Sequence, residues 1–187
     1  MVIASEFYFP SSDGRTLIHV NQWTPLGGPI AGVVQIAHGV AEYGARYEPF
    51  ARFLCGHGFA VVANDHLGHG KSLVEGCPMV YFGDENGWRH AVEDMEELRR
   101  RTAKVFPGVP YFLFGHSMGS FLSRTHLIRY PGRLDGCVLC GTGHMSPALI
   151  AGGKPSPGRI SRAGAPRRTA PRPARWAYGA STSPSPP

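Results

Sequence analysis

Residues 111–120 read YFLFGHSMGS, and this stretch decides the fold expected for the chain. The apolar run at 111–114 predicts a buried strand, and the residues after Ser117 have helical spacing up to a stop at 130–132. The G-x-S-x-G motif between them has the strand-to-helix setting in which a serine occupies a sharp turn with strained backbone angles. Glycines are needed on both sides because a side chain there would strike the neighbouring strand or helix. Ser117 is therefore a candidate nucleophile.

Short apolar runs alternate with helical segments over most of the chain. The predicted strands of this kind are 33–37, 59–63, 111–114 and 137–140, and the predicted helices are 49–55, 88–105 and 118–128. Near-continuous apolar strands separated by helices are typical of a parallel sheet with helices on both faces. Two earlier runs, 6–10 and 16–23, flank a Ser-Ser-Asp-Gly turn and predict an antiparallel hairpin. The expected fold class is α/β with a mostly parallel sheet.

Two of the predicted helices carry side-chain patterns that assign their faces. Residues 88–105 have an apolar stripe at i, i+3, i+4 and i+7 spacing. Two ion pairs are expected on the water-facing side of this helix, Glu96–Arg100 and Glu97–Arg101. The helix that follows the G-x-S-x-G motif carries one stripe of larger side chains, formed by Met118, Phe121, Leu122, Thr125 and Ile128. Each stripe predicts the face that packs against the sheet.

The net charge of +6 comes from the end of the chain. Residues 1–150 hold 12 Lys and Arg against all 13 Asp and Glu, whereas residues 151–187 hold seven basic residues and no acidic one. A nucleic-acid-binding protein gathers its basic residues on a folded surface, so no nucleic-acid partner is expected. Residues 151–187 are rich in Pro, Arg and Ala and have few large apolar side chains, which predicts a disordered tail. The folded portion is expected to be residues 1–150.

Metal, disulfide and membrane features are not expected. Cys137 and Cys140 lie in a predicted strand, where positions three apart point to opposite faces, so all four cysteines are interpreted as buried reduced thiols. The histidines lack the helical spacing of zinc ligands, and neither a metal nor another cofactor is predicted. The chain shows no signal-peptide pattern and no run of roughly 18 apolar residues. A cytoplasmic protein without a transmembrane segment is the expectation.

Three motifs follow one another along the chain: HGVAEY at 38–43 with Arg46-Tyr47, DHLGHGKS at 65–72, and GHSMG at 115–119. In this order and spacing they resemble the signatures of α/β-hydrolases of the monoacylglycerol lipase and lysophospholipase (serine aminopeptidase-like) group. The resemblance covers roughly residues 8 to 150 and implies the amino-terminal part of the α/β-hydrolase fold. The chain departs from the group at Ala41, where glycine is usual, at Tyr43, where histidine is frequent, and at Ser120, where a second glycine is common.

The motif geometry and the resemblance together predict an ester-cleaving serine hydrolase. The backbone N–H of Met118, at the start of a helix, and that of Val40, in the loop after an earlier strand, are expected to form the oxyanion hole. The residues expected to shape or support the site are Gly115, His116 and Gly119 in the turn, His38 and Gly39 in the loop, and, as the resemblance implies, Asp65, His66 and His69 beside it. The resemblance implies a small ester or lipid substrate, with transient contact to a membrane surface.

The acid and base that a serine nucleophile needs are not expected in this chain. In α/β-hydrolases they follow the serine in the order Asp or Glu, then His, and the chain offers Asp135, His126 and His144. Asp135 precedes a strand, which places it at the wrong edge of the sheet, and His126 lies in mid-helix. His144 lies at the correct edge, but the resemblance places it at the start of a cap region. The chain is therefore expected to be truncated or frameshifted after about residue 150, without the cap and the carboxy-terminal part.

Several alternatives stay open at this point. The Pro/Arg/Ala-rich segment could be the genuine tail of a compact variant. The chain could be a non-catalytic or unstable fragment, or a binding module on the same scaffold. It could also belong to an enzyme with another serine-elbow chemistry, such as an aminopeptidase, a carbon–carbon bond hydrolase or an acyltransferase.

Overall fold

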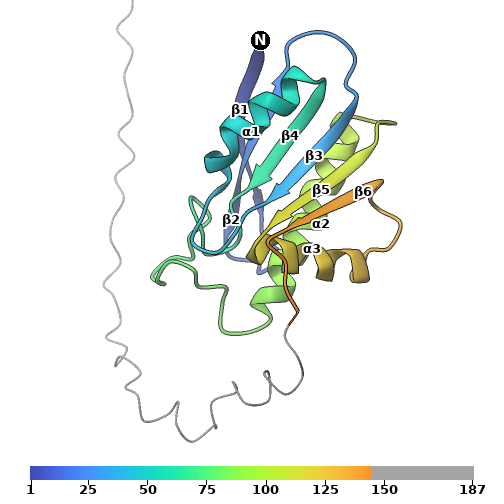
Figure 1. Ribbon diagram of the computed structural model, residues 1–187. Coiled ribbons are helices and arrows are strands. Elements are labelled where there is room, and N and C mark those ends of the chain that lie inside the picture. The colour runs from blue at the N-terminus through green and yellow to red at the C-terminus, as the bar shows by residue number, and fades with distance from the viewer. Residues whose placement is uncertain (145–187) are drawn as a thin grey trace, which may run out of the picture. The chain divides into compact units, whose positions relative to one another are not determined.

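Six strands form one sheet in the computed structural model, which describes residues 1–144 (Figure 1). The strands are β1 (Val2–Pro10), β2 (Leu17–Pro25), β3 (Gly32–Ala37), β4 (Phe59–Asn64), β5 (Tyr111–His116) and β6 (Gly136–Cys140). The helices are the 3-10 turn η1 (Gly44–Tyr47), α1 (Glu48–Gly56), α2 (Gly87–Val105) and α3 (Met118–Arg129). The predicted tail at 151–187 and the predicted boundary at residue 150 lie outside the described residues.

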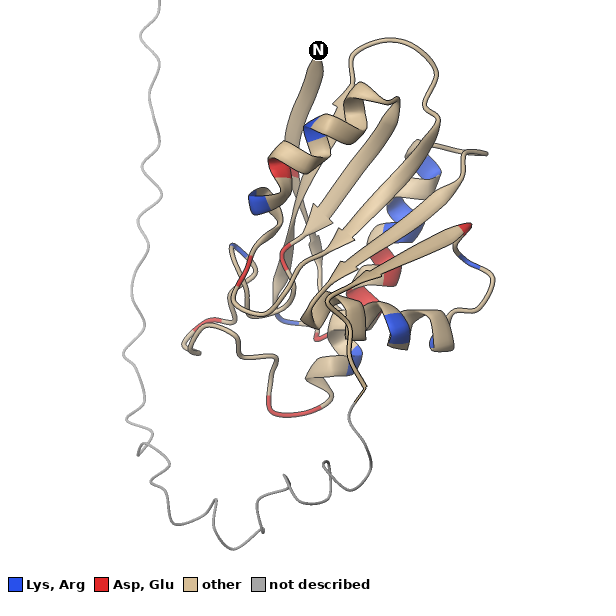
Figure 2. Ribbon diagram, in the orientation of Figure 1, with Lys and Arg blue, Asp and Glu red and all other residues tan. Residues whose placement is uncertain are grey.

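The sheet is mostly parallel, as the sequence predicts. Its strand order is β1-β2-β4-β3-β5-β6, and β3, β4, β5 and β6 run parallel to one another. The hairpin of β1 and β2 is antiparallel and joins the sheet through β4. The four parallel strands carry no Lys, Arg, Asp or Glu (Figure 2). Uncharged strands suit a sheet that is covered on both faces.

Helices cover both faces of this sheet, which confirms the expected layering (Figure 1). On one face Ala51 and Cys55 of α1 pack with buried apolar residues of β3 and β4. On the other face Met95 and Leu98 of α2 belong to clusters with strand residues, and Leu122 of α3 joins Met95. Most of the apolar stripe predicted for α2 is buried there, and burial of this kind is the main stabilising contribution to such a fold.

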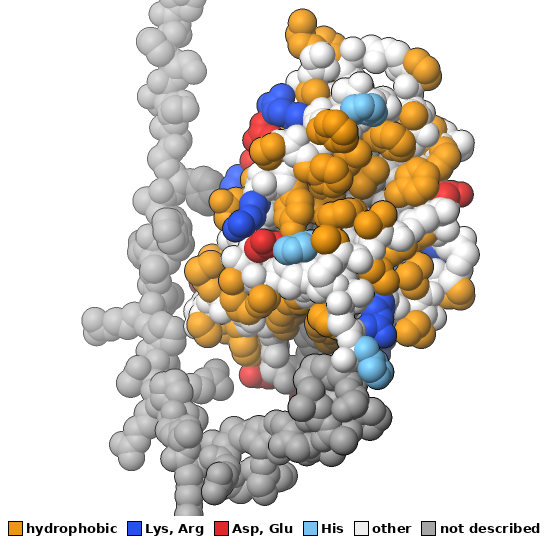
Figure 3. All heavy atoms as spheres, viewed as in Figure 1, with side chains coloured by type: hydrophobic (Ala, Val, Ile, Leu, Met, Phe, Trp, Pro, Cys, Tyr) orange, Lys and Arg blue, Asp and Glu red, His pale blue; other side chains and the backbone are white. Residues whose placement is uncertain are grey.

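Apolar side chains are exposed on the face that carries α1. Figure 3 shows apolar side chains gathered on this side of the molecule. Phe53 of α1 and Val138 of β6 are 60% and 56% exposed. Among residues 1–144 no helix is long and apolar enough to cross a membrane.

Two of the predicted helix patterns are wrong in detail. On α3 the buried residues are Gly119, Ser120, Leu122, Ser123 and His126, so the stripe predicted from larger side chains does not mark the packed face. On α2 Glu96 is buried and pairs with Arg99 at 2.8 Å rather than with Arg100, whereas the predicted pair Glu97–Arg101 is present at 2.7 Å. The α2 error arises because Glu96 turns inward and lies 2.9 Å from Nε2 of His126 of α3. The α3 error arises because small residues lie where the helix packs closely, with Gly119 against the end of β3.

The four cysteines are free thiols, but their predicted burial is only partly right. Cys55 is buried in the cluster under α1, whereas Cys77 and Cys137 are half-buried and Cys140 is exposed. Cys140 is the last residue of β6, one of the two edge strands of the described sheet, where no further strand covers it.

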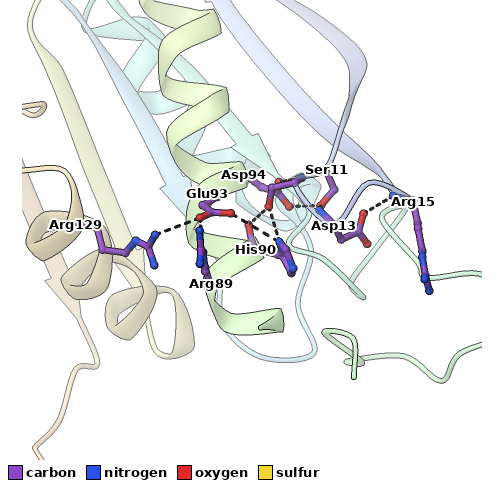
Figure 4. A network of polar contacts seen from close by, with 9 residues as sticks. Ser11, Asp13, Arg15, Arg89, His90, Glu93, Asp94 and Arg129 are labelled. Carbon is purple, nitrogen blue, oxygen red and sulfur yellow. Dashed lines mark hydrogen bonds and ion pairs between the residues drawn. The ribbon is translucent and has the colours of Figure 1, made fainter. Parts of the chain in front are cut away.

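A buried carboxylate fastens the turn between β1 and β2 to α2 (Figure 4). The Ser11 hydroxyl and the Ser12 N–H both donate to the Asp94 carboxylate, each at 2.7 Å. Burial raises the pKa of Asp94 to about 6 against the opposing effect of these two donors. Asp94 is therefore partly protonated in the folded state in mildly acidic solution.

Candidate active site

The topology brings two loops together at one edge of the sheet. From β3 the chain moves to β4 on one side and later to β5 on the other side, so the loops after β3 and β5 diverge. Ligands of open α/β sheets bind in the crevice at such a switch point, at the carboxyl ends of the strands. The loop that begins at His38 follows β3, and Ser117 follows β5.

Ser117 occupies a sharp turn between β5 and α3. Its backbone has φ +50° and ψ −118°, a conformation that costs of order 1–3 kcal/mol for a residue other than glycine. Bonds on both sides hold this geometry. The Ser117 N–H donates to the carbonyl of Cys140 at 2.9 Å, and its carbonyl accepts the Ser120 hydroxyl at 2.6 Å. The strain is therefore imposed by β6 on one side and by the first turn of α3 on the other.

The two glycines of the motif are required by close packing of the turn. A Cβ at Gly119 would overlap the carbonyl oxygen of Ala37, the last residue of β3, and would lie 2.7 Å from the carbonyl oxygen of His38. A Cβ at Gly115 would lie 2.6 Å from the Gly119 carbonyl oxygen. The start of α3 thus presses directly on the end of β3, which is the reason that the sequence pattern suggests.

The loop after β3 passes over Ser117. A Cβ at Gly39 would lie 3.3 Å from the Ser117 Cβ. The N–H groups of Val40, the next residue of this loop, and of Met118, the first residue of α3, donate to no acceptor among residues 1–144. The amino end of α3 also contributes positive electrostatic potential at this place. The arrangement offers two backbone donors and a helix terminus to an oxygen that develops negative charge.

His38 braces this loop in its neutral form. Its Nδ1 donates to the Gly39 carbonyl at 2.7 Å, and its Nε2 accepts the His66 N–H at 3.0 Å. The side chain is fully buried, and burial lowers the pKa of His38 to about 4. A neutral ring with the proton on Nδ1 satisfies both bonds. His38 therefore connects the loop after β3 to the loop after β4.

Asp65 organises the loop after β4. Its carboxylate accepts the N–H groups of Gly44 at 2.6 Å and Lys71 at 2.8 Å, and it bonds Nδ1 of His19 at 3.0 Å. These contacts join three segments that are far apart in the sequence. His19 was not among the residues predicted for the site, and its place within an apolar strand of the hairpin gives no sign of this contact.

The predicted neighbours His66 and His69 pack against His38. Their ring centres lie 4.3 Å and 5.3 Å from the His38 ring, and burial lowers the pKa of both. Within residues 1–144 no group of three or more histidine, cysteine, aspartate or glutamate side chains could hold a metal ion. The three rings are therefore a packed, uncharged cluster under the loop.

None of the three candidate triad partners hydrogen-bonds to Ser117 in the described part of the chain. Asp135 accepts the Tyr111 N–H at 2.7 Å, at the opposite end of β5 from Ser117 and thus about 20 Å away along the strand. His126 bonds Glu96, and although burial opposes it, bonds from Arg99 and His126 hold the pKa of Glu96 at about 2. His144 is exposed beyond β6.

The left-handed backbone of Ala41 predicts a small gain from glycine. Ala41 has φ +56° in the turn between Gly39 and Glu42, which costs about 1–2 kcal/mol for a residue with a Cβ. Glycine loses about 0.5–1 kcal/mol more chain entropy on folding. Ala41→Gly is therefore expected to raise the free energy of unfolding by about 0.5–1 kcal/mol, measured by urea denaturation.

A matched control separates backbone strain from chain entropy. Ala31 is exposed, lies just before β3 and has no positive φ, so Ala31→Gly is expected to lower stability by up to about 1 kcal/mol. Equal losses in the two variants would show that residue 41 carries no strain.

Comparison with known proteins agrees with this geometry. The Hydrolase_4 family, described as serine aminopeptidase S33, matches residues 28–171, which includes all three signatures. The chain belongs to this family. The chain is 36% identical over 141 residues to the monoglyceride lipase of Homo sapiens, and the match covers 75% of this chain and 42% of that protein. It is 36% identical over 152 residues to the monoacylglycerol lipase of Mycolicibacterium smegmatis, covering 79% and 51% of the two chains.

A solved structure supports the α/β-hydrolase fold. The thermostable carboxyl esterase from Bacillus coagulans superimposes with a TM-score of 0.72 at 34% identity, over 79% of this chain and 47% of the esterase. The chain thus spans about half the length of these relatives. The α/β-hydrolase fold expected from the three signatures is confirmed for the residues that align.

Proposed function

We propose that this hydrolase carries the nucleophile and the oxyanion-binding elements of a serine hydrolase for carboxylic esters of the monoacylglycerol or lysophospholipid type. One observation carries the proposal: Ser117 lies at a turn with φ +50° between β5 and α3, directly under the loop after β3. The similarity to monoglyceride lipases and to a carboxyl esterase supports the substrate class. The substrate is a small ester or lipid, and no cofactor takes part.

The geometry suits acyl transfer through a covalent intermediate. The Ser117 oxygen attacks the ester carbonyl, and the carbonyl oxygen becomes negatively charged where the N–H groups of Val40 and Met118 converge. The alcohol leaves, and water then releases the acyl group from Ser117. Removal of one such donor costs about 10²–10³ in kcat in enzymes of this kind. The bracing residues His38, Asp65, His66 and His69 keep the loop in place while the charge develops.

Proton transfer is the part of this mechanism that residues 1–144 do not supply. Asp135 and His126 are engaged with Tyr111 and Glu96, which supports their assignment to structural roles. Turnover by this chain is therefore expected to be roughly 10⁴- to 10⁶-fold below that of a family member with a complete triad. The cytoplasmic location and the transient contact with a membrane surface stay predictions.

Acylation assays with a Ser117→Ala variant test the proposal. The wild-type chain is expected to be acylated slowly by a short p-nitrophenyl ester, detected as an acyl adduct by mass spectrometry of the intact protein, and Ser117→Ala should not form this adduct. Ser5→Ala, an exposed change in β1, should leave the rate unchanged. Equal adduct formation in wild type and Ser117→Ala would refute the role of Ser117 and support a non-catalytic fragment. Cleavage of an aminoacyl anilide in preference to the esters would favour an aminopeptidase instead.

A further inference from the structure

We infer that Glu42 is the positioning residue that holds the oxyanion loop, residues 38–42 after β3, over Ser117. The inference rests on the proposed function and adds a residue that was not among those predicted for the site. Glu42 lies in the loop after β3, three residues beyond Gly39. Its carboxylate is nearly buried, with 16% of the side chain exposed. It contacts both the loop after β3 and His116, which precedes Ser117.

The first contact closes the loop on itself. Glu42 Oε2 accepts the Gly39 N–H at 2.8 Å, and the Glu42 N–H donates to the Gly39 carbonyl at 3.4 Å. Side chain and backbone of one residue thus fix both polar groups of Gly39. Because the Gly39 N–H is occupied by the carboxylate, the next N–H in the loop, that of Val40, is left to face the substrate.

The second contact ties the loop to the turn at Ser117. The Tyr47 hydroxyl donates to the same Glu42 oxygen at 2.9 Å. Nδ1 of His116 lies 3.1 Å from the Tyr47 oxygen and 3.4 Å from Glu42 Oε2. His116 directly precedes Ser117, so one carboxylate connects the oxyanion loop, η1 and the last residue of β5.

The charge of Glu42 strengthens this connection. Burial tends to raise its pKa, but the bonds from the Gly39 N–H, Tyr47 and His116 lower it below the usual range of a glutamate. The carboxylate is therefore ionised at neutral pH, and hydrogen bonds to an ionised acceptor are roughly twice as strong as neutral ones. Among the described residues it also pairs with the exposed Arg46, whose Nε lies 3.5 Å from Oε1. Most contacts of the Glu42 carboxylate are therefore with groups of the site, and only one is with an exposed charged side chain.

The role of Glu42 differs from that of a general scaffold residue. It does not touch the expected position of the substrate oxygen, because its carboxylate accepts the Gly39 N–H. Its loss should change the position and mobility of the loop more than the stability of the sheet. Two measurements separate these effects: hydrogen exchange of the Gly39 amide, which reports on the loop, and the rate of Ser117 phosphonylation by a fluorophosphonate, whose oxygen needs the oxyanion donors.

The variants are Glu42→Ala, Glu42→Gln and the control Glu48→Ala. Glu48 is a carboxylate on α1 that pairs only with Arg52 in the described chain. Glu42→Ala should speed exchange at Gly39 by roughly 10- to 100-fold, with no change at Ile36 in β3. Glu42→Gln, which keeps one acceptor without the charge, should fall between wild type and Glu42→Ala. Phosphonylation of Ser117 should slow by at least about 10-fold in Glu42→Ala and stay unchanged in Glu48→Ala.

The outcomes distinguish this inference from the proposed function. Unchanged exchange at Gly39 in both Glu42 variants would overturn it, as would equal exchange increases at Gly39 and Ile36. If wild-type Ser117 is not phosphonylated, the nucleophile assignment fails, but the exchange data still decide the role of Glu42. If Glu42→Ala does not fold, Glu42→Gln gives the same comparison with a smaller effect.

Discussion

Gly119→Ala is expected to lower the free energy of unfolding by about 3 kcal/mol or more, the largest effect on stability of any single substitution considered for this chain. The new Cβ would overlap the carbonyl oxygen of Ala37 and lie 2.5 Å from its carbonyl carbon. Both atoms belong to the backbone of β3, so no side-chain rotation can relieve the contact. Either β3 or the start of α3 must move. Urea denaturation monitored by circular dichroism measures the loss.

A second glycine provides the matched control. Gly56 ends α1 and has no positive φ, and a Cβ added there would have nothing within 4 Å. Gly56→Ala is expected to leave stability unchanged or to raise it by up to about 1 kcal/mol through helix propensity and reduced chain entropy. Similar small effects in both variants would contradict the packing of the turn against β3.

Acid is expected to destabilise the site through its buried histidines. Burial lowers the pKa of His38 from 6.5 to about 4, so the unfolded chain binds more protons than the folded chain between these values. The stability contributed by neutral His38 is complete above pH 6.5 and is lost as the pH falls toward 4. The loss from His38 alone amounts to about 2 kcal/mol at pH 5. His66 and His69 shift in the same direction and add to it.

Protonation of Asp94 has the opposite effect on the free energy of unfolding, so its contribution must be separated from that of His38. Its pKa is raised to about 6 in the folded state, so its ionisation opposes folding at neutral pH and this penalty shrinks as the pH falls. The wild type is therefore compared with His38→Gln, in which the amide can still accept the His66 N–H but does not titrate. The drop in unfolding free energy between pH 7 and pH 5 should be about 2 kcal/mol smaller in the variant. Equal drops would show that His38 is not held neutral.

The fold was largely predictable because the sequences of the parallel strands are distinctive. These segments carry no charged residue and alternate with segments of helical spacing, which leaves few possible arrangements of the strands in a sheet. The packed face of α3 was not predictable from its own residues. His126 is buried there with its Nε2 within hydrogen-bond distance of Glu96 of α2, and this partner is 30 residues away in the sequence. Side-chain size alone therefore pointed to the wrong face.

In the candidate site, too, some features were predictable from the sequence and others depend on the fold. The glycine spacing around Ser117 marks the turn, since only close backbone packing requires glycine at both places. The supporting contacts depend on the fold: Asp65 meets Gly44 and His19 only when β2, β4 and η1 are assembled. Glu42 is an intermediate case. A carboxylate three residues after Gly39 has the spacing to accept its N–H, and this local signal could have been read from the sequence.

The central claim is that Ser117 is the nucleophile, and the attachment site of a fluorophosphonate probe tests it most directly. Trypsin releases residues 105–124 as one peptide, which contains Ser117 together with the buried Ser120 and Ser123. Fragmentation of this peptide by mass spectrometry locates the adduct. The expected result is a slow, single modification on Ser117 that is absent from Ser117→Ala. An adduct on Ser120 or Ser123, or equal labelling of Ser117→Ala, would contradict the assignment.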